Sequence, residues 1–328
     1  MEIQEPSDKE KVPTMLIDIH VHTARRAGEG LSRPNGNRYP RPGELLGMMD
    51  DAGIDRAAVM CAVSPECRYC FVTPEEILEV CAEFPDRLIP FANFDPRMLT
   101  NSTESCFREH LTHYKSAGCR GIGEYCPNLP FDDPLNLNFL RQVEEAGLPL
   151  TFHIAPEIGG FYGCYDEVGL PRLENVLREC PDLVLLGHSQ PFWSEISGDV
   201  TERNRNGYPS GPVEPGRVVE LMRRYPNLHG DLSAGSGHNA ISRDPEFGCR
   251  FMEEFQDRLY FGTDIANVPQ ELPIVCYFER LRKEDLISGD AYEKITWRNA
   301  CRLLGLDLET GDVTGESNAR SGRARRSE

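Results

Sequence analysis

The sequence lacks the long apolar segments that membrane and secreted proteins require. No run of about 18 or more apolar residues is present, which is the length that a membrane-spanning helix needs. The first residues, Met1 to Lys11, are polar and acidic and contain no apolar signal-peptide core. We therefore expect a cytoplasmic protein with no membrane partner.

Basic residues are also few. The 35 Lys and Arg residues are outnumbered by 53 Asp and Glu residues, and the formal net charge is −18. An acidic surface repels phosphate backbones, so nucleic acid is not an expected partner. Among the 12 cysteines, Cys67 and Cys70 have metal or redox spacing, but no second pair of that spacing follows. A zinc ribbon is therefore disfavoured, and without an export signal reduced thiols are the default.

What the chain does contain is a regular alternation of apolar runs and amphipathic stretches after residue 14. The apolar runs predict strands at 15–20, 56–63, 87–92, 119–124, 149–154, 182–187, 227–232 and 258–263. The amphipathic stretches predict helices at 42–53, 74–84, 102–117, 136–146, 170–179, 214–225, 245–255 and 270–281. Thr73-Pro74 is a typical helix start, and Ala146-Gly147 is a typical helix end.

This alternation predicts an α/β protein built on a parallel sheet. The apolar runs show no polar alternation, as strands covered on both faces require, and eight is the number of strands that closes a (β/α)8 TIM barrel. An open, doubly wound sheet is the alternative, but no glycine-rich phosphate loop follows the first strand.

We expect one barrel over residues 14–308, with a polar N-terminal extension at 1–13 and a disordered tail at 309–328. A long loop insertion, Pro191 to Pro215, follows the sixth predicted strand and is rich in Gly, Pro, Asn and charged residues. Loops of this length at the carboxyl end of a barrel are typical lids or specificity loops.

The carboxyl ends of five predicted strands carry residues that bind metal ions. His20 and His22 lie two residues apart, so both imidazoles point to the same side of a strand. The other strand ends hold Glu124, His153, His188 and Asp264. Barrel enzymes place their active sites at these ends, and three or four histidine and carboxylate ligands with an open position are the catalytic arrangement for zinc and similar ions.

The order of these residues resembles the amidohydrolase superfamily. The match is carried by Asp18-Ile19-His20-Val21-His22, Gly187-His188, Phe261-Gly262-Thr263-Asp264 and a closing helix at Trp297 to Leu306. The residues of these motifs are most similar to those of the amidohydrolase-related family that includes the aminocarboxymuconate-semialdehyde decarboxylase-like proteins. The resemblance covers about residues 14–306. It implies a distorted barrel that holds one or two divalent ions, and it suggests a homodimer.

By this resemblance, the metal ligands are His20, His22, His153 and Asp264, and His188 is a second-metal ligand or a proton shuttle. Glu124 stands where superfamily members with two ions place a bridging carboxylated lysine or a glutamate. The alternative is that Glu124 binds substrate or a neighbouring histidine. Zinc is the expected ion, with manganese or iron as alternatives.

A divalent ion lowers the pKa of bound water from near 16 to about 7. Asp264, beside that water, is the expected base and later the acid, and His188 is expected to polarise a carbonyl or stabilise the oxyanion. The same site can instead hold a carboxylated substrate and protonate its carbon as carbon dioxide leaves. The ligands alone do not separate these two reactions.

The loops offer candidate contacts for a small-molecule substrate. Five arginines follow His22, namely Arg25, Arg26, Arg33, Arg38 and Arg41. Because a guanidinium binds a carboxylate through two parallel hydrogen bonds, we expect one or two of them, Arg25 and Arg38 foremost, to hold a substrate carboxylate. Further candidate contacts are His238, Trp193 and Tyr125, each of which follows a strand end.

The sequence therefore predicts a metal-dependent hydrolase that cleaves an amide, lactone or ester in a small, carboxylate-bearing molecule. A decarboxylase that uses a single metal ion is the enzymatic alternative. A non-catalytic barrel is disfavoured because the ligand set is complete, and nuclease activity is disfavoured by the negative charge.

Overall fold

The computed structural model describes residues 15–26, 33, 35–66 and 69–306. The predicted extension and tail, and Cys67, lie outside the described residues. The strands are β1 (Ile17–Val21), β2 (Arg56–Val59), β3 (Leu88–Pro90), β4 (Ile122–Tyr125), β5 (Leu150–Ala155), β6 (Cys164–Tyr165), β7 (Leu185–His188), β8 (Leu228–Asp231) and β9 (Leu259–Tyr260). Apart from the two-residue β6, each of these strands falls within or next to one of the predicted strands.

The strands form two parallel sheets that meet at both of their edges. One sheet has the order β1-β2-β3, and the other has the order β4-β5-β7-β8-β9, with β6 paired to β5. A parallel bridge between Ala92 and Ile122 connects the end of β3 to β4. At the other junction, the Ile19 N–H donates to the Phe261 carbonyl at 2.9 Å, and Val21 bridges Ile265. The predicted distorted (β/α)8 barrel is confirmed.

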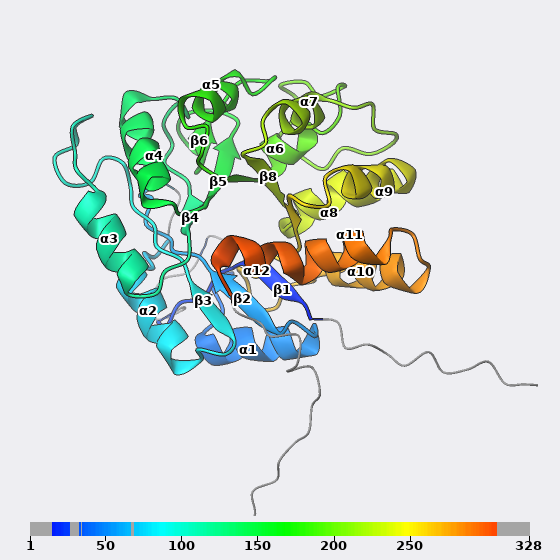
Figure 1. Ribbon diagram of the computed structural model, residues 1–328, viewed down its shortest axis with the longest axis horizontal. Coiled ribbons are helices and arrows are strands. Elements are labelled where there is room, and N and C mark those ends of the chain that lie inside the picture. The colour runs from blue at the N-terminus through cyan, green and yellow to red at the C-terminus, as the bar shows by residue number, and fades with distance from the viewer. Residues whose placement is uncertain (1–14, 27–32, 34, 67–68, 307–328) are drawn as a thin grey trace, which may run out of the picture.

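The helices surround these strands (Figure 1). They are α1 (Pro42–Asp51), α2 (Pro74–Glu83), α3 (Arg108–Ser116), α4 (Pro134–Ala146), α5 (Pro171–Glu179), α6 (Gln190–Ser194), α7 (Arg217–Arg224), α8 (Ala234–Ser242), α9 (Pro245–Glu254), α10 (Pro273–Lys283), α11 (Gly289–Glu293), the π-helix η1 (Lys294–Arg298) and α12 (Asn299–Leu304). No described helix has the length and apolar character needed to cross a membrane.

Local sequence explains where the main helices begin and end. The Thr73 hydroxyl accepts the Glu76 N–H at the start of α2, and Pro74 occupies the first helical position. Asp133 caps α4 in the same way, and α4 ends where Gly147 adopts a φ of 62°. The start of α2 and the end of α4 are those that the sequence predicts, whereas the Asp133 cap starts α4 two residues before the predicted 136.

Three helical segments differ from the predictions. α3 begins at Arg108 rather than at 102, because Ser102 and Ser105 form a turn in which the Ser105 N–H donates to the Ser102 carbonyl. The segment around His238, predicted as a loop, is helix α8 despite its glycines. The insertion after the sixth predicted strand begins with the short helix α6 before it becomes a loop.

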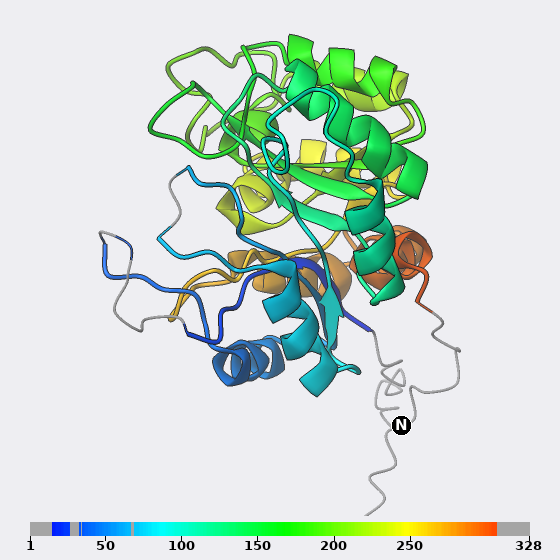
Figure 2. The same cartoon turned by 90° about the vertical axis from the view of Figure 1, so that its left-hand side faces the viewer.

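The loop part of the insertion, which follows α6, contacts the barrel through Arg205, whose side chain is fully buried. The Arg205 guanidinium donates to the Asp166 carbonyl at 2.7 Å and lies 3.6 Å from the Glu195 carboxylate. The Arg205 carbonyl accepts the Ser194 hydroxyl at 2.6 Å. The insertion is therefore packed onto the barrel at its midpoint. Figure 2 shows its green connections on the same side of the molecule as the blue connection after β1.

Candidate metal centre

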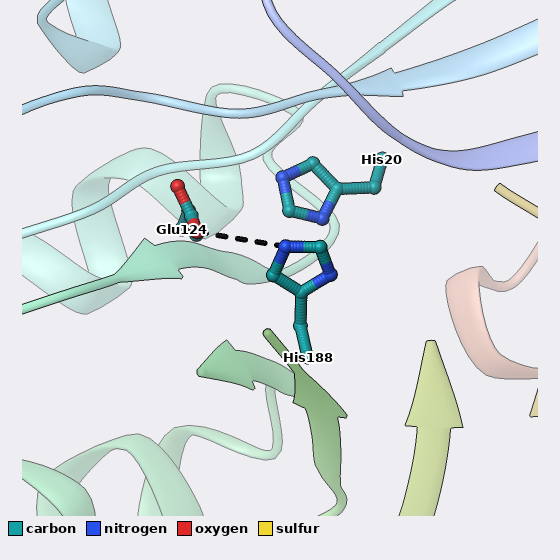
Figure 3. Close-up of side chains that lie close together, drawn as sticks. All are labelled: His20, Glu124 and His188. Atoms are coloured by element: carbon teal, nitrogen blue, oxygen red, sulfur yellow. Dashed lines mark ion pairs between the residues drawn. The ribbon is translucent and has the colours of Figure 1, made fainter. Parts of the chain in front are cut away.

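Three strands bring His20, Glu124 and His188 together at the carboxyl end of the barrel. All three side chains are buried, and one ligand atom from each lies within 4.8 Å of the others. Figure 3 shows them converging from β1, β4 and β7, with Nε2 of His188 3.9 Å from a Glu124 oxygen. The group offers two imidazole nitrogens and a carboxylate oxygen, which suits a divalent transition metal ion.

A second group of potential ligands shares His20 and adds His22 and Asp264. Nε2 of His20 lies 3.1 Å from Nε2 of His22, and the Asp264 carboxylate lies 3.4 Å from His22 and 3.7 Å from His20. Two imidazole nitrogens and a carboxylate oxygen within reach of one another are ligands that suit a divalent cation, so the donor set fits the predicted metal. The Asp264 side chain is 25% exposed, which leaves it open to the cavity above.

His153 lies next to these groups through Glu124. Its Nδ1 is 2.6 Å from one Glu124 oxygen, and the other oxygen is 3.7 Å from Nε2 of His22. The register of β5 and β7 places His153 directly beside His188. The structure thus gathers all six residues predicted as metal ligands, but His153 is outside the two groups whose ligand atoms lie closest together.

The charges of the buried residues favour a cation at this place. Burial disfavours the protonated form of His20, but the facing carboxylates, Asp231 foremost, outweigh it and raise the pKa of His20 to about 10. For His22, burial dominates and lowers the pKa, which keeps a lone pair free for a metal. Burial opposes ionisation of Asp264, yet His22 and His20 hold its pKa below the usual range. An ionised carboxylate among imidazoles is a suitable metal environment.

Asp231, at the end of β8, is a buried carboxylate that the sequence analysis missed. Its Oδ2 accepts a hydrogen bond from Nδ1 of His20 at 2.7 Å and lies 3.4 Å from Nδ1 of His188. The signal that could have found it is its position, because Asp231 ends an apolar run as Glu124 and Asp264 do.

Asp18 connects β1, which carries His20, to the segment after β9 that carries Asp264. Its carboxylate accepts the backbone N–H of His20 at 2.9 Å and that of Thr263 at 3.0 Å, together with the Thr263 hydroxyl. Asp18, two residues before His20, therefore fixes β1 against the segment that follows β9.

A cavity of about 550 Å³ opens above the candidate metal centre. It is lined by His22, Arg33, Asn35, Tyr39, Tyr69, Glu124, Tyr162, Tyr208, Ala234, Gly235, Asp264, Ala266, Asn267 and Gln270. Among the five arginines after His22, Arg33 is the one in this lining. Its guanidinium donates to the Asn267 side chain at 2.5 Å and lies 4.9 Å from the centre of the Tyr39 ring and 5.3 Å from that of Tyr69.

Arg25 and Arg38, which are predicted to hold a substrate carboxylate, lie outside this lining. Arg25 pairs with the carboxylate of Glu83 on α2 at 2.5 Å. Arg38 forms a two-pronged pair with Glu44 on α1, at 2.6 and 2.7 Å. Their partners are helix surface carboxylates, so these arginines join the first loop to the neighbouring helices. Arg33 is the arginine of this loop that lines the cavity.

Three other residues predicted to contact substrate make packing contacts within the protein. The Trp193 indole N–H donates to the Asp231 carbonyl at 2.9 Å, and its ring packs in the core. Tyr125 is buried, stacked on Phe139, with its hydroxyl donating to Asn136 at 2.7 Å. His238 packs edge-on against Tyr277, at 5.6 Å between ring centres. None of the three belongs to the described lining of the cavity.

The chain belongs to the amidohydrolase family, whose model matches residues 17–306. This confirms the resemblance based on the strand-end motifs. The family consists of enzymes that generally use divalent metal ions, which agrees with the two ligand groups in the barrel. A comparison with curated proteins gave no match.

Solved structures with the same fold include both hydrolases and decarboxylases. An uncharacterised TIM-barrel protein from Bordetella bronchiseptica is 18% identical, with a TM-score of 0.59, over 89% of this chain and 98% of that one. A probable 2-pyrone-4,6-dicarboxylic acid hydrolase from Acinetobacter baumannii, with citric acid bound, is 14% identical, with a TM-score of 0.55 over 88% and 99%. The 5-carboxyvanillate decarboxylase of Sphingomonas paucimobilis is 15% identical, with a TM-score of 0.55 over 89% and 99%. These similarities establish the barrel fold.

Proposed function

We propose that the chain is a metal-dependent hydrolase that cleaves an amide, lactone or ester bond in a small, carboxylate-bearing molecule. The observation that carries this proposal is the combination of two overlapping ligand groups at the floor of the cavity with the Arg33 guanidinium in its wall. His20, His22, Glu124 and Asp264 would hold the ion or ions, with zinc the first candidate and manganese or iron the alternatives. When bound, such an ion supplies a water that ionises near neutral pH.

The residues around the ion have separate tasks in this reaction. Asp264 is the ligand candidate most open to the cavity, so we assign it the removal of a proton from the attacking water and its delivery to the leaving group. Nε2 of His188 lies 3.9 Å from the Asp264 carboxylate, close enough to act on the same substrate oxygen. We assign His188 the stabilisation of negative charge on that oxygen.

Arg33 is the candidate partner for a substrate carboxylate. Its guanidinium faces the cavity between two tyrosine rings, and Asn267 fixes its direction. Four tyrosines, at 39, 69, 162 and 208, provide flat apolar faces with polar edges along the same cavity. The names of the hydrolase and decarboxylase structures above denote carboxylated ring compounds, which supports a substrate of that kind for this site.

A decarboxylase that uses one ion is the second candidate, because the fold is shared with the carboxyvanillate decarboxylase. In this reaction Arg33 would hold one part of the substrate while a carboxylate leaves the substrate carbon as carbon dioxide, and a proton from Asp264 or His188 would take its place on that carbon. Glu124 helps to distinguish the candidates, since it stands where it would bridge two ions, and a decarboxylase with a single ion needs no bridging carboxylate.

The proposal is tested with purified protein that is stripped of metal and then reloaded with zinc, manganese or iron. The substrates are carboxylated lactones, amides and esters, assayed for hydrolysis, and carboxylated phenols, assayed for carbon dioxide release. We expect hydrolysis that is lost on chelation and restored by one of these ions. Hydrolysis that is unaffected by chelation would contradict the proposal, and carbon dioxide release without hydrolysis would favour the second candidate.

A further inference from the structure

We propose that Asp231 is a positioning residue that serves two histidines at once, orienting His20 toward the metal and His188 toward the substrate. The inference rests on the proposed metal-dependent function and extends it to a residue on β8. It is carried by the geometry of one carboxylate shared between two imidazoles.

The shared atom is Oδ2 of Asp231. It lies 2.7 Å from Nδ1 of His20 and 3.4 Å from Nδ1 of His188. The side chains of Asp231 and His20 are fully buried, and that of His188 is 2% exposed, so water does not compete for these contacts. The carboxylate therefore meets both rings on the side that faces away from the ligand groups.

The position of Asp231 is itself fixed from three directions. Its Oδ1 accepts the Ser233 N–H at 2.9 Å, and its carbonyl accepts the Trp193 indole N–H at 2.9 Å. Gly262, two residues after β9, lies close to the same carboxylate, since a Cβ at Gly262 would be 3.1 Å from Oδ1. A rigid carboxylate of this kind can hold an imidazole in one orientation.

Ser233 completes the arrangement on the His188 side. Its hydroxyl lies 3.0 Å from Nδ1 of His188 and 3.4 Å from Nδ1 of His20. His20 thus has the carboxylate as its nearer partner, and His188 has the hydroxyl. Both imidazoles therefore contact Asp231 and Ser233, but His20 lies closer to the carboxylate and His188 lies closer to the hydroxyl.

This arrangement fixes which nitrogen of each ring is available. An Nδ1–H that points at Asp231 or Ser233 leaves the lone pair on Nε2. Nε2 of His20 is the atom that faces His22 and Asp264, and Nε2 of His188 is the atom that faces Glu124 and Asp264. Asp231 therefore favours the tautomer that leaves Nε2 of His20 available to a metal, and its contact with Nδ1 of His188 helps to hold that ring with Nε2 toward Glu124 and Asp264.

The test compares Asp231→Asn with Ser233→Ala, and uses Asp166→Asn as a control. Asp166 is an equally buried carboxylate that is bound by backbone N–H groups of 167, 172 and 173 and contacts no site histidine. Zinc affinity is measured by competition with a chelating dye, which needs no substrate. We expect Asp231→Asn to weaken zinc binding by about 10- to 100-fold. Ser233→Ala should change zinc affinity by less than about twofold, because the nearer partner of His20 is the Asp231 carboxylate.

Equal zinc affinity in Asp231→Asn and the parent, or equal weakening in Asp166→Asn, would overturn the proposal. If Asp231→Asn does not fold, spectra of the parent protein with 15N-labelled histidine decide the question. Zinc-loaded protein should show His20 and His188 with the proton on Nδ1, and protons on Nε2 would overturn the inference. If the parent binds zinc but hydrolyses nothing, the proposed function is refuted but the inference about Asp231 is not. The comparison of zinc affinities would then still test the role of Asp231.

Discussion

One oxygen of the Glu124 carboxylate lies 2.6 Å from Nδ1 of His153, and the other lies 3.7 Å from Nε2 of His22. Glu124 therefore lies between His22, which belongs to one of the two ligand groups, and His153, which belongs to neither. A carboxylate with its two oxygens directed at different histidines can bridge two ions or can orient His153 beside a single ion.

Glu124→Gln separates these roles. If Glu124 is a metal ligand, the neutral amide should reduce the number of bound ions and lower kcat by about 10- to 100-fold. The measurement combines metal analysis with steady-state kinetics, and Glu44→Gln on α1, outside the cavity, is the control. Unchanged metal content and activity would exclude Glu124 as a ligand and favour the decarboxylase candidate.

Arg33→Ala should raise KM for a carboxylated substrate more than it lowers kcat. A hydrogen bond to a charged group contributes about 1.5–3 kcal/mol, which corresponds to about a 10- to 100-fold change in KM. Arg38→Ala is the matched control, because it removes an arginine from the same loop whose partner is Glu44 rather than the cavity. An equal effect of the two substitutions would show that the loop matters and the Arg33 guanidinium does not.

His229 should make the stability of the protein depend on pH. It lies on β8, with Nδ1 2.8 Å from the Tyr260 hydroxyl oxygen, and burial lowers its pKa to about 4. Since an unfolded histidine has a pKa of about 6.5, the unfolded chain binds more protons between these values. The contribution of His229 to the free energy of unfolding is therefore complete above pH 6.5. It decreases as the pH falls toward 4, by at most about 3 kcal/mol.

Denaturant unfolding of the parent and His229→Gln between pH 4 and 7 measures this contribution. The variant should lose less stability on acidification than the parent does. His113→Gln, at an exposed position on α3, should follow the parent curve. Identical pH dependence in the parent and His229→Gln would contradict the assignment.

The packing of α9 predicts opposite effects for two glycine substitutions. A Cβ at Gly248 would lie 1.9 Å from the Ile241 carbonyl oxygen of α8, whereas a Cβ at Gly47 on α1 would meet nothing within 4 Å. Gly248→Ala should therefore lower the free energy of unfolding by about 1–3 kcal/mol, and Gly47→Ala should raise it by about 0.5–1 kcal/mol. Thermal or urea unfolding distinguishes them, and a neutral Gly248→Ala would mean that α8 and α9 are farther apart.

Much of the fold could be predicted because buried parallel strands consist of uninterrupted apolar residues. His20, Glu124, His188 and Asp264 were predictable as a group for a related reason: the carboxyl ends of parallel strands meet at one end of a barrel. Asp231 follows the same rule, but its run, Leu228-His229-Gly230-Asp231, is less apolar than the other strand ends, so its position is a weaker signal. Helix α8 was missed because its glycines have low helix propensity, and packing overrides that preference.

The substrate contacts could not be predicted in the same way. Loop residues have no periodicity that shows which side chain turns toward the cavity, so Arg33 could not be separated from Arg25 or Arg38. Trp193 and Tyr125 follow strand ends as the metal-binding residues do, but large aromatic side chains at these positions pack into the core. Only tertiary contacts distinguish the two outcomes.

Metal content tests the central claim most directly. The parent, His22→Ala and Asp264→Asn are purified without chelator, and their bound divalent ions are counted by elemental analysis together with a zinc titration of the stripped proteins. The account predicts at least one ion per parent chain and zinc affinity weakened about tenfold or more in both variants. A parent chain that binds no divalent ion, or variants that bind zinc as tightly as the parent, would contradict it.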